Sequence, residues 1–206
     1  SCYAALVRDL YDDLKTLSTT QKRDWIEYLN RFQCDDGLFR DGVIECTLAE
    51  EIDWWGWRHL TLHVCMALTA LGGVAAKPIL YLDRFKKKGA ISDWLESRSW
   101  QKDPSCVSNE IQNIGSFLQY SRDFQEQPWC QNVLEELFLW LDKHQDQKTG
   151  LWGNAFDSPY QLSNGVQTGY HIWCLYFYDK RPLQYVDRII DSCLATQNRL
   201  GGYGVQ

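Results

Sequence analysis

A short motif recurs along this chain of 206 residues, and it constrains the fold more than any other feature. The stretch QDQKTGLWG, residues 145–153, places a glutamine, a glycine and a tryptophan in close order between two amphipathic segments. Related stretches are QCDDGLF from Gln33, a looser WQKDPSCVSNE around Gln101, and QNRLGGYG from Gln197. Successive copies are roughly 50 residues apart with variable insertions, which indicates a repeat whose unit is a supersecondary element.

An amphipathic segment precedes each of these glutamines. Apolar residues recur in it at helical spacing with charged residues between them, which predicts an outer helix with one solvated face. The first is expected to begin at Ser18 or Thr19, a good N-cap, and the second to break near Lys88 and Gly89. The other starts are expected at prolines, which suit the first helical turn: Pro78, Pro128 and Pro182.

A second, more apolar helix is predicted after each of the first three turns, beginning at Asp53, Asn109 and Asn164. Two of these carry apolar residues around most of the cylinder, which is typical of an inner helix with neighbours on several sides. Essentially no strand is indicated. The sequence therefore predicts an all-α chain with about four outer and four inner helices, counting the N-terminal one.

This pattern resembles the repeats of the α/α-toroid proteins, which include terpenoid cyclases such as squalene–hopene cyclase and the β subunits of protein prenyltransferases. Their Q-x-x-x-G-x-W/F element is matched at 145–152 and more loosely at 33–39 and 197–203. The resemblance implies that residues 1–206 form one repeat domain, an α/α toroid or open arc of about four helical hairpins. A closed toroid needs more hairpins, so it also implies a fragment, or a ring that a partner chain or missing segment completes.

Composition excludes several classes of function. The net charge of −6 argues against nucleic acid or an acidic membrane surface as a partner. No apolar run approaches the roughly 18 residues that a membrane span needs, and the N-terminus lacks the pattern of a signal peptide. The eight cysteines show no C-x-x-C pair and no zinc-ligand spacing, which is typical of buried, reduced thiols. We therefore expect a cytoplasmic protein.

The turn residues are interpreted as a stabilising device rather than a site. The glutamine can bond to backbone groups left without partners at an adjacent helix end. The glycine, Gly37, Gly150 or Gly202, permits a positive φ, and the aromatic residue packs on the neighbouring hairpin. Any ligand cavity is instead expected where the inner helices start.

Two polar stripes mark those helix starts. Asn109, Gln112, Asn113 and Ser116 follow one another at offsets of three and four residues, and Asn164, Gln167, Thr168 and His171 repeat the same offsets. Each buried polar group needs a partner, so a stripe either faces a cavity with water or ligand, or bonds to another helix. The leading Asp53, Asn109 and Asn164 are either N-caps or a polar ring at the mouth of the cavity.

The residue types suggest which side chains could act on a ligand. Asp53 and Glu110 are the acids best placed to reach a cavity, and His171 could serve as an acid, a base or a hydrogen-bonding group. The sequence around Tyr170 and His171 resembles a Tyr-His stretch that supplies a zinc ligand in prenyltransferase β subunits, but the Asp-x-Cys pair of that site is missing here. The D-x-D-D acid and D-D-x-x-D magnesium motifs of the cyclases are missing too.

His59 and His63, at i and i+4, lack a third ligand, so no metal is expected, and no nucleotide motif is seen. The cofactor stays unknown. Trp54 and Trp57 could stabilise a carbocation or stack on sugar rings. The candidates are catalytic Asp53, Glu110 and His171, and ligand-binding Trp54, Trp57, His59, Asn109, Gln112, Asn113, Asn164, Gln167, Thr168 and Tyr170.

Three functions follow from these features. The first is an enzyme acting on an isoprenoid or other apolar substrate in an aromatic-lined cavity, which the resemblance favours. The second is a carbohydrate-active toroid, which processes or binds a polysaccharide and which the tryptophans and the Asn/Gln stripes favour. The third is a scaffold whose concave face binds another protein. The chemistry of the cavity distinguishes them.

Overall fold

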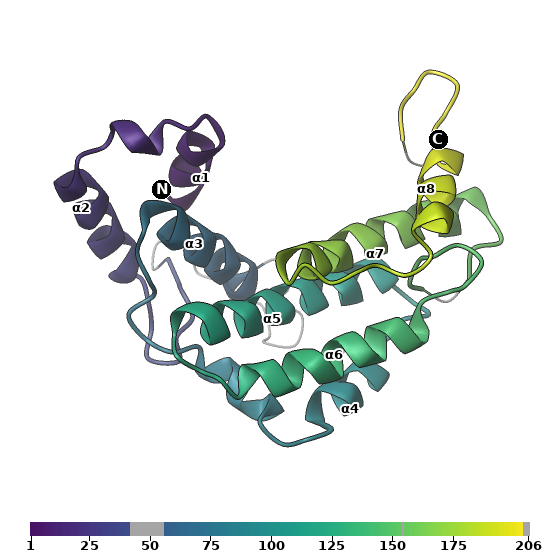
Figure 1. The fold of residues 1–206 in the computed structure, drawn as a ribbon, viewed down its shortest axis with the longest axis horizontal. Coiled ribbons are helices and arrows are strands. Elements are labelled where there is room, and N and C mark those ends of the chain that lie inside the picture. The colour runs from purple at the N-terminus through teal and green to yellow at the C-terminus, as the bar shows by residue number, and fades with distance from the viewer. Residues whose placement is uncertain (42–55, 154, 204–206) are drawn as a thin grey trace. The chain divides into compact units, whose positions relative to one another are not determined.

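The computed structural model describes residues 1–41, 56–153 and 155–203, and across these ranges every regular element is a helix (Figure 1). The predicted all-α class is therefore confirmed, while the toroid or arc stays a prediction. The elements, with η for 3-10 helices, are α1 (Cys2–Leu10), η1 (Leu14–Thr16), α2 (Thr19–Asn30), α3 (Trp57–Leu71), η3 (Leu80–Phe85), α4 (Ala90–Glu96), α5 (Pro104–Phe124), α6 (Cys130–His144), α7 (Pro159–Tyr178) and α8 (Val186–Ala195).

The chain divides into two compact units. The first comprises 1–86 and 116–131, and the second comprises 87–115 and 132–206. In the first unit α1 and α2 both pack on α3. In the second unit α7 packs on α8, and the pocket discussed below lies wholly within this unit.

Two predicted features of the outer helices are confirmed. Ser18 caps α2, since its Oγ accepts a hydrogen bond from the Gln21 N–H at 3.2 Å while Gln21 Oε1 accepts from the Ser18 N–H at 2.9 Å. This reciprocal capping box satisfies two backbone donors that the helix leaves without intrahelical partners. The second outer segment does break, because η3 ends at Phe85 and α4 begins after Gly89, whose φ is +87°.

The predicted starts of the inner helices were wrong. α5 begins at Pro104 rather than Asn109, and α7 begins at Pro159 rather than Asn164. Proline suits the first helical position because its φ is already helical and its missing N–H would have no partner there. Asp103 and Ser158 supply the capping oxygens, to the N–H groups of residues 106 and 161. The two asparagines therefore lie inside the helices and are not N-caps.

The starts predicted at prolines for the outer helices were also wrong. The regular elements begin two to four residues after each proline, at Leu80, Cys130 and Val186. These prolines belong to the connections that lead into the outer helices. The third predicted inner start, Asp53, lies outside the described residues, and α3 begins at Trp57.

The turn glutamines bond as predicted to backbone groups. Gln33 donates from Nε2 to the carbonyls of Gly37 (2.9 Å) and Lys77 (2.8 Å), and its Oε1 accepts from the Lys77 N–H at 2.8 Å. Gln145 Nε2 donates to the carbonyls of Gly150 (2.8 Å) and Gln184 (3.1 Å). Each glutamine thus joins its own turn to the segment that leads into the next outer element.

The third turn, from Gln197, has the same internal geometry. Its Nε2 donates to the Gly201 carbonyl at 3.1 Å, and Gly201, not the predicted Gly202, adopts the positive φ of +86°. The aromatic positions differ, however. Phe39 and Trp152 are 0% and 1% exposed in the first two turns, whereas Tyr203 is 63% exposed. The stretch around Gln101, predicted as a fourth copy, instead connects α4 to α5 without a turn glycine.

The cysteines and the helix lengths bear on two further expectations. All seven cysteines within the described ranges are free thiols, and Cys46 lies outside those ranges. Cys2, Cys65 and Cys130 are buried as expected, but Cys174 is exposed. None of the helices described is long and apolar enough to cross a membrane.

The first prediction concerns the glutamine bonds. Gln33→Ala removes three hydrogen bonds, and it leaves the buried Gly37 carbonyl and the part-buried Lys77 N–H without that partner, so we expect a loss of about 2–4 kcal/mol in unfolding free energy. Gln197→Ala is the matched control, since this exposed amide makes its described bond only within its own turn, and should cost about 0.5 kcal/mol. Urea unfolding at low protein concentration measures both. Equal losses would contradict the role of the bonds between segments.

A second prediction concerns close backbone approach at Gly37. A Cβ there would lie 2.0 Å from the Pro78 carbonyl oxygen, and φ is +84°. Gly89 has nearly the same φ, +87°, but nothing lies within 4 Å of its Cβ position. We expect Gly37→Ala to cost more than about 3 kcal/mol and Gly89→Ala about 1–2 kcal/mol, the ordinary penalty of this conformation. Thermal unfolding of the pair separates the clash from the conformational cost.

Candidate functional site

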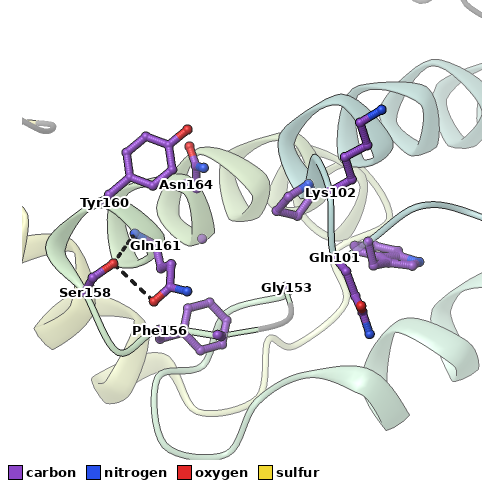
Figure 2. Close-up of a pocket in the computed structure, with 12 residues that line it drawn as sticks. Gln101, Lys102, Gly153, Phe156, Ser158, Tyr160, Gln161 and Asn164 are labelled. Carbon is purple, nitrogen blue, oxygen red and sulfur yellow. Dashed lines mark hydrogen bonds between the residues drawn. The ribbon is translucent and has the colours of Figure 1, made fainter.

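A pocket of about 290 Å³ lies at the first turns of α5 and α7 in the second unit (Figure 2). Its walls come from the connection before α5, the first turn of α5, the loop before α7 and the first two turns of α7. It is small for a ligand pocket, since such pockets usually measure about 300–1,000 Å³. The lining residues are Trp100, Gln101, Lys102, Pro104, Gly153, Ala155, Phe156, Ser158, Tyr160, Gln161, Asn164 and Gly165.

Three amide side chains give the pocket its polar character. Gln161 Oε1 accepts a hydrogen bond from the Ser158 hydroxyl at 3.1 Å (Figure 2). It also accepts one from the Asp157 N–H at 3.1 Å, and together these bonds fix the amide at the cap of α7. Its Nε2 group makes no hydrogen bond to the residues described, and neither do the side-chain amides of Gln101 and Asn164. The pocket therefore offers both donors and acceptors that a ligand could use.

Three aromatic rings form the other part of the lining, and Trp100 is held most firmly. Its Nε1 donates to the Leu95 carbonyl at 3.0 Å, and its ring stacks on Trp140 at 5.4 Å with an interplanar angle of 23°. Trp140 in turn stacks on His144 at 3.8 Å and donates from Nε1 to Glu96 at 2.7 Å. The indole of Trp100 is thus a preorganised wall.

Phe156 is the second fixed ring, and it depends on a glycine of α7. A Cβ at Gly165 would lie 2.5 Å from Phe156 Cε1, so only glycine lets the ring approach the helix this closely. Tyr160, the third aromatic residue, is largely exposed at the rim. The lining carries one cation, Lys102, and none of its described members carries a carboxylate.

A second polar cluster lies in the core between α5 and α7. His171 is buried, with Nδ1 at 2.9 Å from Ser108 Oγ and Nε2 at 3.2 Å from Asn109 Nδ2. Asn113 Nδ2 donates to Asn109 Oδ1 at 2.9 Å, which orients the Asn109 amide so that its NH₂ faces the ring. Nε2 therefore accepts, Nδ1–H donates to the serine, and the serine hydroxyl donates to the Ser105 carbonyl at 2.8 Å.

These contacts decide between the two explanations of the polar stripes for part of their length. Asn109 and His171 contact each other across the α5–α7 pair, Asn113 bonds to Asn109 within α5, and none of the three is among the lining residues of this pocket, so for Asn109 and His171 the bonds between helices are the explanation observed. Thr168 is also buried, and its hydroxyl donates to the Asn164 carbonyl of its own helix at 2.8 Å. Of the predicted residues, Asn164 alone lines the pocket described here.

The remaining predicted residues of the second unit do not join the pocket. Glu110 lies next to Arg98, with 3.4 Å between carboxylate oxygen and guanidinium nitrogen. Gln112 is half-buried, and Gln167 and Tyr170 are exposed on α7. None of these four residues lines the pocket, so the structure does not bring the candidate acid Glu110 together with His171 in a shared cavity.

Two of the candidate residues described by the structure belong to the first unit. Trp57 and His59 lie on α3, and Asp53 and Trp54 lie outside the described residues. The His59 and His63 rings are 4.4 Å apart, and His63 Nδ1 lies 2.8 Å from the His59 carbonyl. Burial, and then the nearby charge of His63, lower the pKa of His59. Among the described residues no group of three or more potential ligands is placed to hold a metal ion.

Sequence reasoning missed most of the pocket lining, including Trp100, Phe156, Tyr160 and Gln161. The signal that could have found them is the pair of prolines. Asp103-Pro104 and Ser158-Pro159 both read as an N-cap followed by the first helical residue, and the pocket is built around these two starts. Asn109 and Asn164, the predicted starts, lie one to two turns after the observed starts of α5 and α7.

Comparison with known proteins adds no identification: no family model, no curated protein and no solved structure matches this chain. The chemistry of the pocket is therefore the basis for assigning a function.

A third prediction tests the buried cluster. His171→Phe keeps an aromatic ring but leaves the Ser108 hydroxyl and the Asn109 amide without their bonds to the imidazole, so we expect a loss of about 2–4 kcal/mol in unfolding free energy. His144→Phe is the control, because a phenyl ring can still stack on Trp140, and should cost less than about 1 kcal/mol. Chemical denaturation measures both variants. A His171→Phe protein as stable as the wild type would show that these bonds contribute nothing.

Proposed function

We propose that this protein binds a carbohydrate and that the pocket at the first turns of α5 and α7 holds one sugar unit. The observation that carries the proposal is the mixture, in one small pocket, of aromatic rings and amide side chains whose NH₂ groups bond to no described residue. Trp100 and Phe156 supply flat apolar surface. Gln101, Gln161 and Asn164 supply hydrogen-bond donors and acceptors.

A sugar ring matches this mixture because it is amphipathic. Its C–H faces are apolar and can stack on an aromatic ring, as the faces of other apolar groups do. Its hydroxyl groups each donate and accept, and an amide side chain offers one acceptor and two N–H donors in a fixed plane. The preorganised Trp100 indole lowers the entropy lost on binding, since its position does not have to be fixed by the ligand.

The isoprenoid alternative, which the sequence resemblance favours, suits this pocket less well. An isoprenoid chain has no hydrogen-bonding groups, so it would bury the amides of Gln101 and Asn164 without partners. Each buried amide without a bond costs about 1–3 kcal/mol. The toroid resemblance is compatible with either ligand, because one scaffold hosts many functions.

Binding is proposed rather than hydrolysis. Glycoside hydrolysis generally uses two carboxyl groups on either side of the scissile bond. The described lining of the pocket has none, and Glu110, the acid predicted for this role, is paired with Arg98 outside it. The described lining residues therefore support a glycan-binding site and include no pair of catalytic acids.

A fourth prediction tests this function. Titration calorimetry against a panel of neutral oligosaccharides should detect binding, and Trp100→Ala and Asn164→Ala should each weaken it at least about tenfold. Asn164→Ala keeps the backbone carbonyl that Thr168 uses, so the helix should be unaffected. Trp94→Ala is the control, because Trp94 is a tryptophan of α4 that lies against Arg98 and is not among the residues lining the pocket.

Two outcomes would contradict the proposal. One is the absence of binding to every oligosaccharide at saturating concentration. The other is tight binding of a prenyl diphosphate that Trp100→Ala and Asn164→Ala abolish, which would support the isoprenoid alternative instead. Circular dichroism of each variant shows whether a loss of binding reflects loss of the fold.

A further inference from the structure

The indole of Trp100, one wall of the pocket, ends a row of three stacked rings. Trp100 lies against Trp140 at 5.4 Å, and Trp140 lies against His144 at 3.8 Å with an interplanar angle of 17°. Trp140 is buried, whereas the side chain of His144 is 35% exposed. The row therefore connects the wall of the pocket to a titratable group at the surface of the same unit.

Glu96, the last residue of α4, holds the middle of this row. Its Oε1 accepts the hydrogen bond from Trp140 Nε1 at 2.7 Å and also lies 3.5 Å from His144 Nε2. The residue before it, Leu95, supplies the carbonyl that accepts from Trp100 Nε1 at 3.0 Å. The end of α4, which lies alongside α6 (Figure 1), thus fixes both tryptophans.

The contacts of His144 determine which of its nitrogens can take up a proton. Nδ1 lies 2.7 Å from the Trp140 carbonyl one turn earlier on α6. A carbonyl oxygen only accepts hydrogen bonds, so Nδ1 carries a proton whether the ring is neutral or charged. Nε2 is therefore the titrating nitrogen, and it lies beside the carboxylate of Glu96. The neutral ring presents a lone pair there, whereas the protonated ring presents an N–H and a positive charge.

Glu96 is the charged group that contacts this imidazole from α4. On α6 itself, Lys143 is exposed next to His144, and Asp142 accepts a hydrogen bond from a tyrosine of α7. In the turn that follows, Asp146 accepts from the backbone N–H groups of residues 148 and 149. Protonation of Nε2 therefore acts first on the contact between the ring and Glu96.

We propose that His144 and Glu96 are positioning residues for Trp100, and that protonation of His144 tightens ligand binding in the pocket. The inference rests on the proposed carbohydrate-binding function. A protonated His144 forms an ion pair with Glu96, which joins the ends of α4 and α6. The charged ring also stacks on Trp140 as a cation on an indole face. Both contacts hold Trp140 against Trp100.

The consequence is a pH-dependent affinity. A wall that is already fixed loses less entropy when a sugar binds, so the protonated state should bind more tightly. Imidazoles change charge between about pH 5 and 8, and the affinity should therefore rise as the pH falls through this range. The ion pair is partly exposed, so the expected change is about two- to fivefold.

Titration calorimetry at about pH 5.5 and about pH 8 tests this dependence, with maltotetraose, cellotetraose and chitotetraose as probes. His144→Phe keeps a ring on Trp140 but takes up no proton, and Glu96→Gln keeps an acceptor for the indole but no charge. Each variant should bind equally at both pH values. His63→Phe is the control, because His63 belongs to the first unit, and it should keep the pH dependence of the wild type. Circular dichroism at both pH values establishes that every variant is folded.

The indole N–H signals in proton–nitrogen correlation spectra provide a readout that needs no sugar. The signals of Trp100 and Trp140, assigned with Trp→Phe variants, should shift with pH along one common curve, and both shifts should vanish in His144→Phe. Titration of both indoles without binding of any probe would support the positioning role and contradict the proposed function. Sugar binding with the same affinity at both pH values, a Trp100 signal that stays constant, or a pH dependence that persists in both variants would each overturn the positioning role.

Discussion

The hydrogen bonds of the turn glutamines are the interaction on which the rest of this structure depends. A buried turn leaves backbone groups that water cannot reach, and each needs a partner. The amide of Gln145 donates hydrogen bonds to the Gly150 carbonyl in its own turn and to the Gln184 carbonyl just before α8. Trp152, which follows, donates from its indole to the Leu141 carbonyl of α6 at 2.8 Å. The loop that leaves this turn is therefore anchored where it starts to form the wall of the pocket.

The sequence indicated these turns because their chemistry is local. A glutamine, a glycine with positive φ and an aromatic residue act within a few positions of one another. Their pattern can therefore be recognised in the sequence without knowledge of the tertiary structure. Helix starts were harder to place, because asparagine is a common N-cap and drew the prediction to Asn109 and Asn164. The prolines at 104 and 159 were the stronger signal, since proline is tolerated at the first helical position and not in the interior.

The candidate site was harder to predict because its lining comes from separate segments. Trp100 and Phe156 belong to connections whose positions depend on tertiary packing: Trp100 stacks on Trp140 of α6, and Phe156 packs against Gly165. The polar stripe of α7 was ambiguous for a physical reason. It starts at Asn164 in the pocket, continues at Thr168 with a bond to its own helix, and ends at His171 with bonds to α5. Gln167, between the first and third of these, is exposed to solvent, so one periodicity covers four environments.

The buried cluster and the pocket are connected through the register of α5 and α7. The pocket lies between the first turns of these helices, so a shift of one helix along the other would change its shape. An apolar contact such as Leu175 against Gly115 packs well but tolerates small displacements. The bonds from His171 to Ser108 and Asn109 do not, because each has a narrow range of distance and angle. A polar cluster in this core therefore buries less apolar surface than an all-apolar contact would. Its hydrogen bonds hold α5 and α7 in the register that the pocket requires.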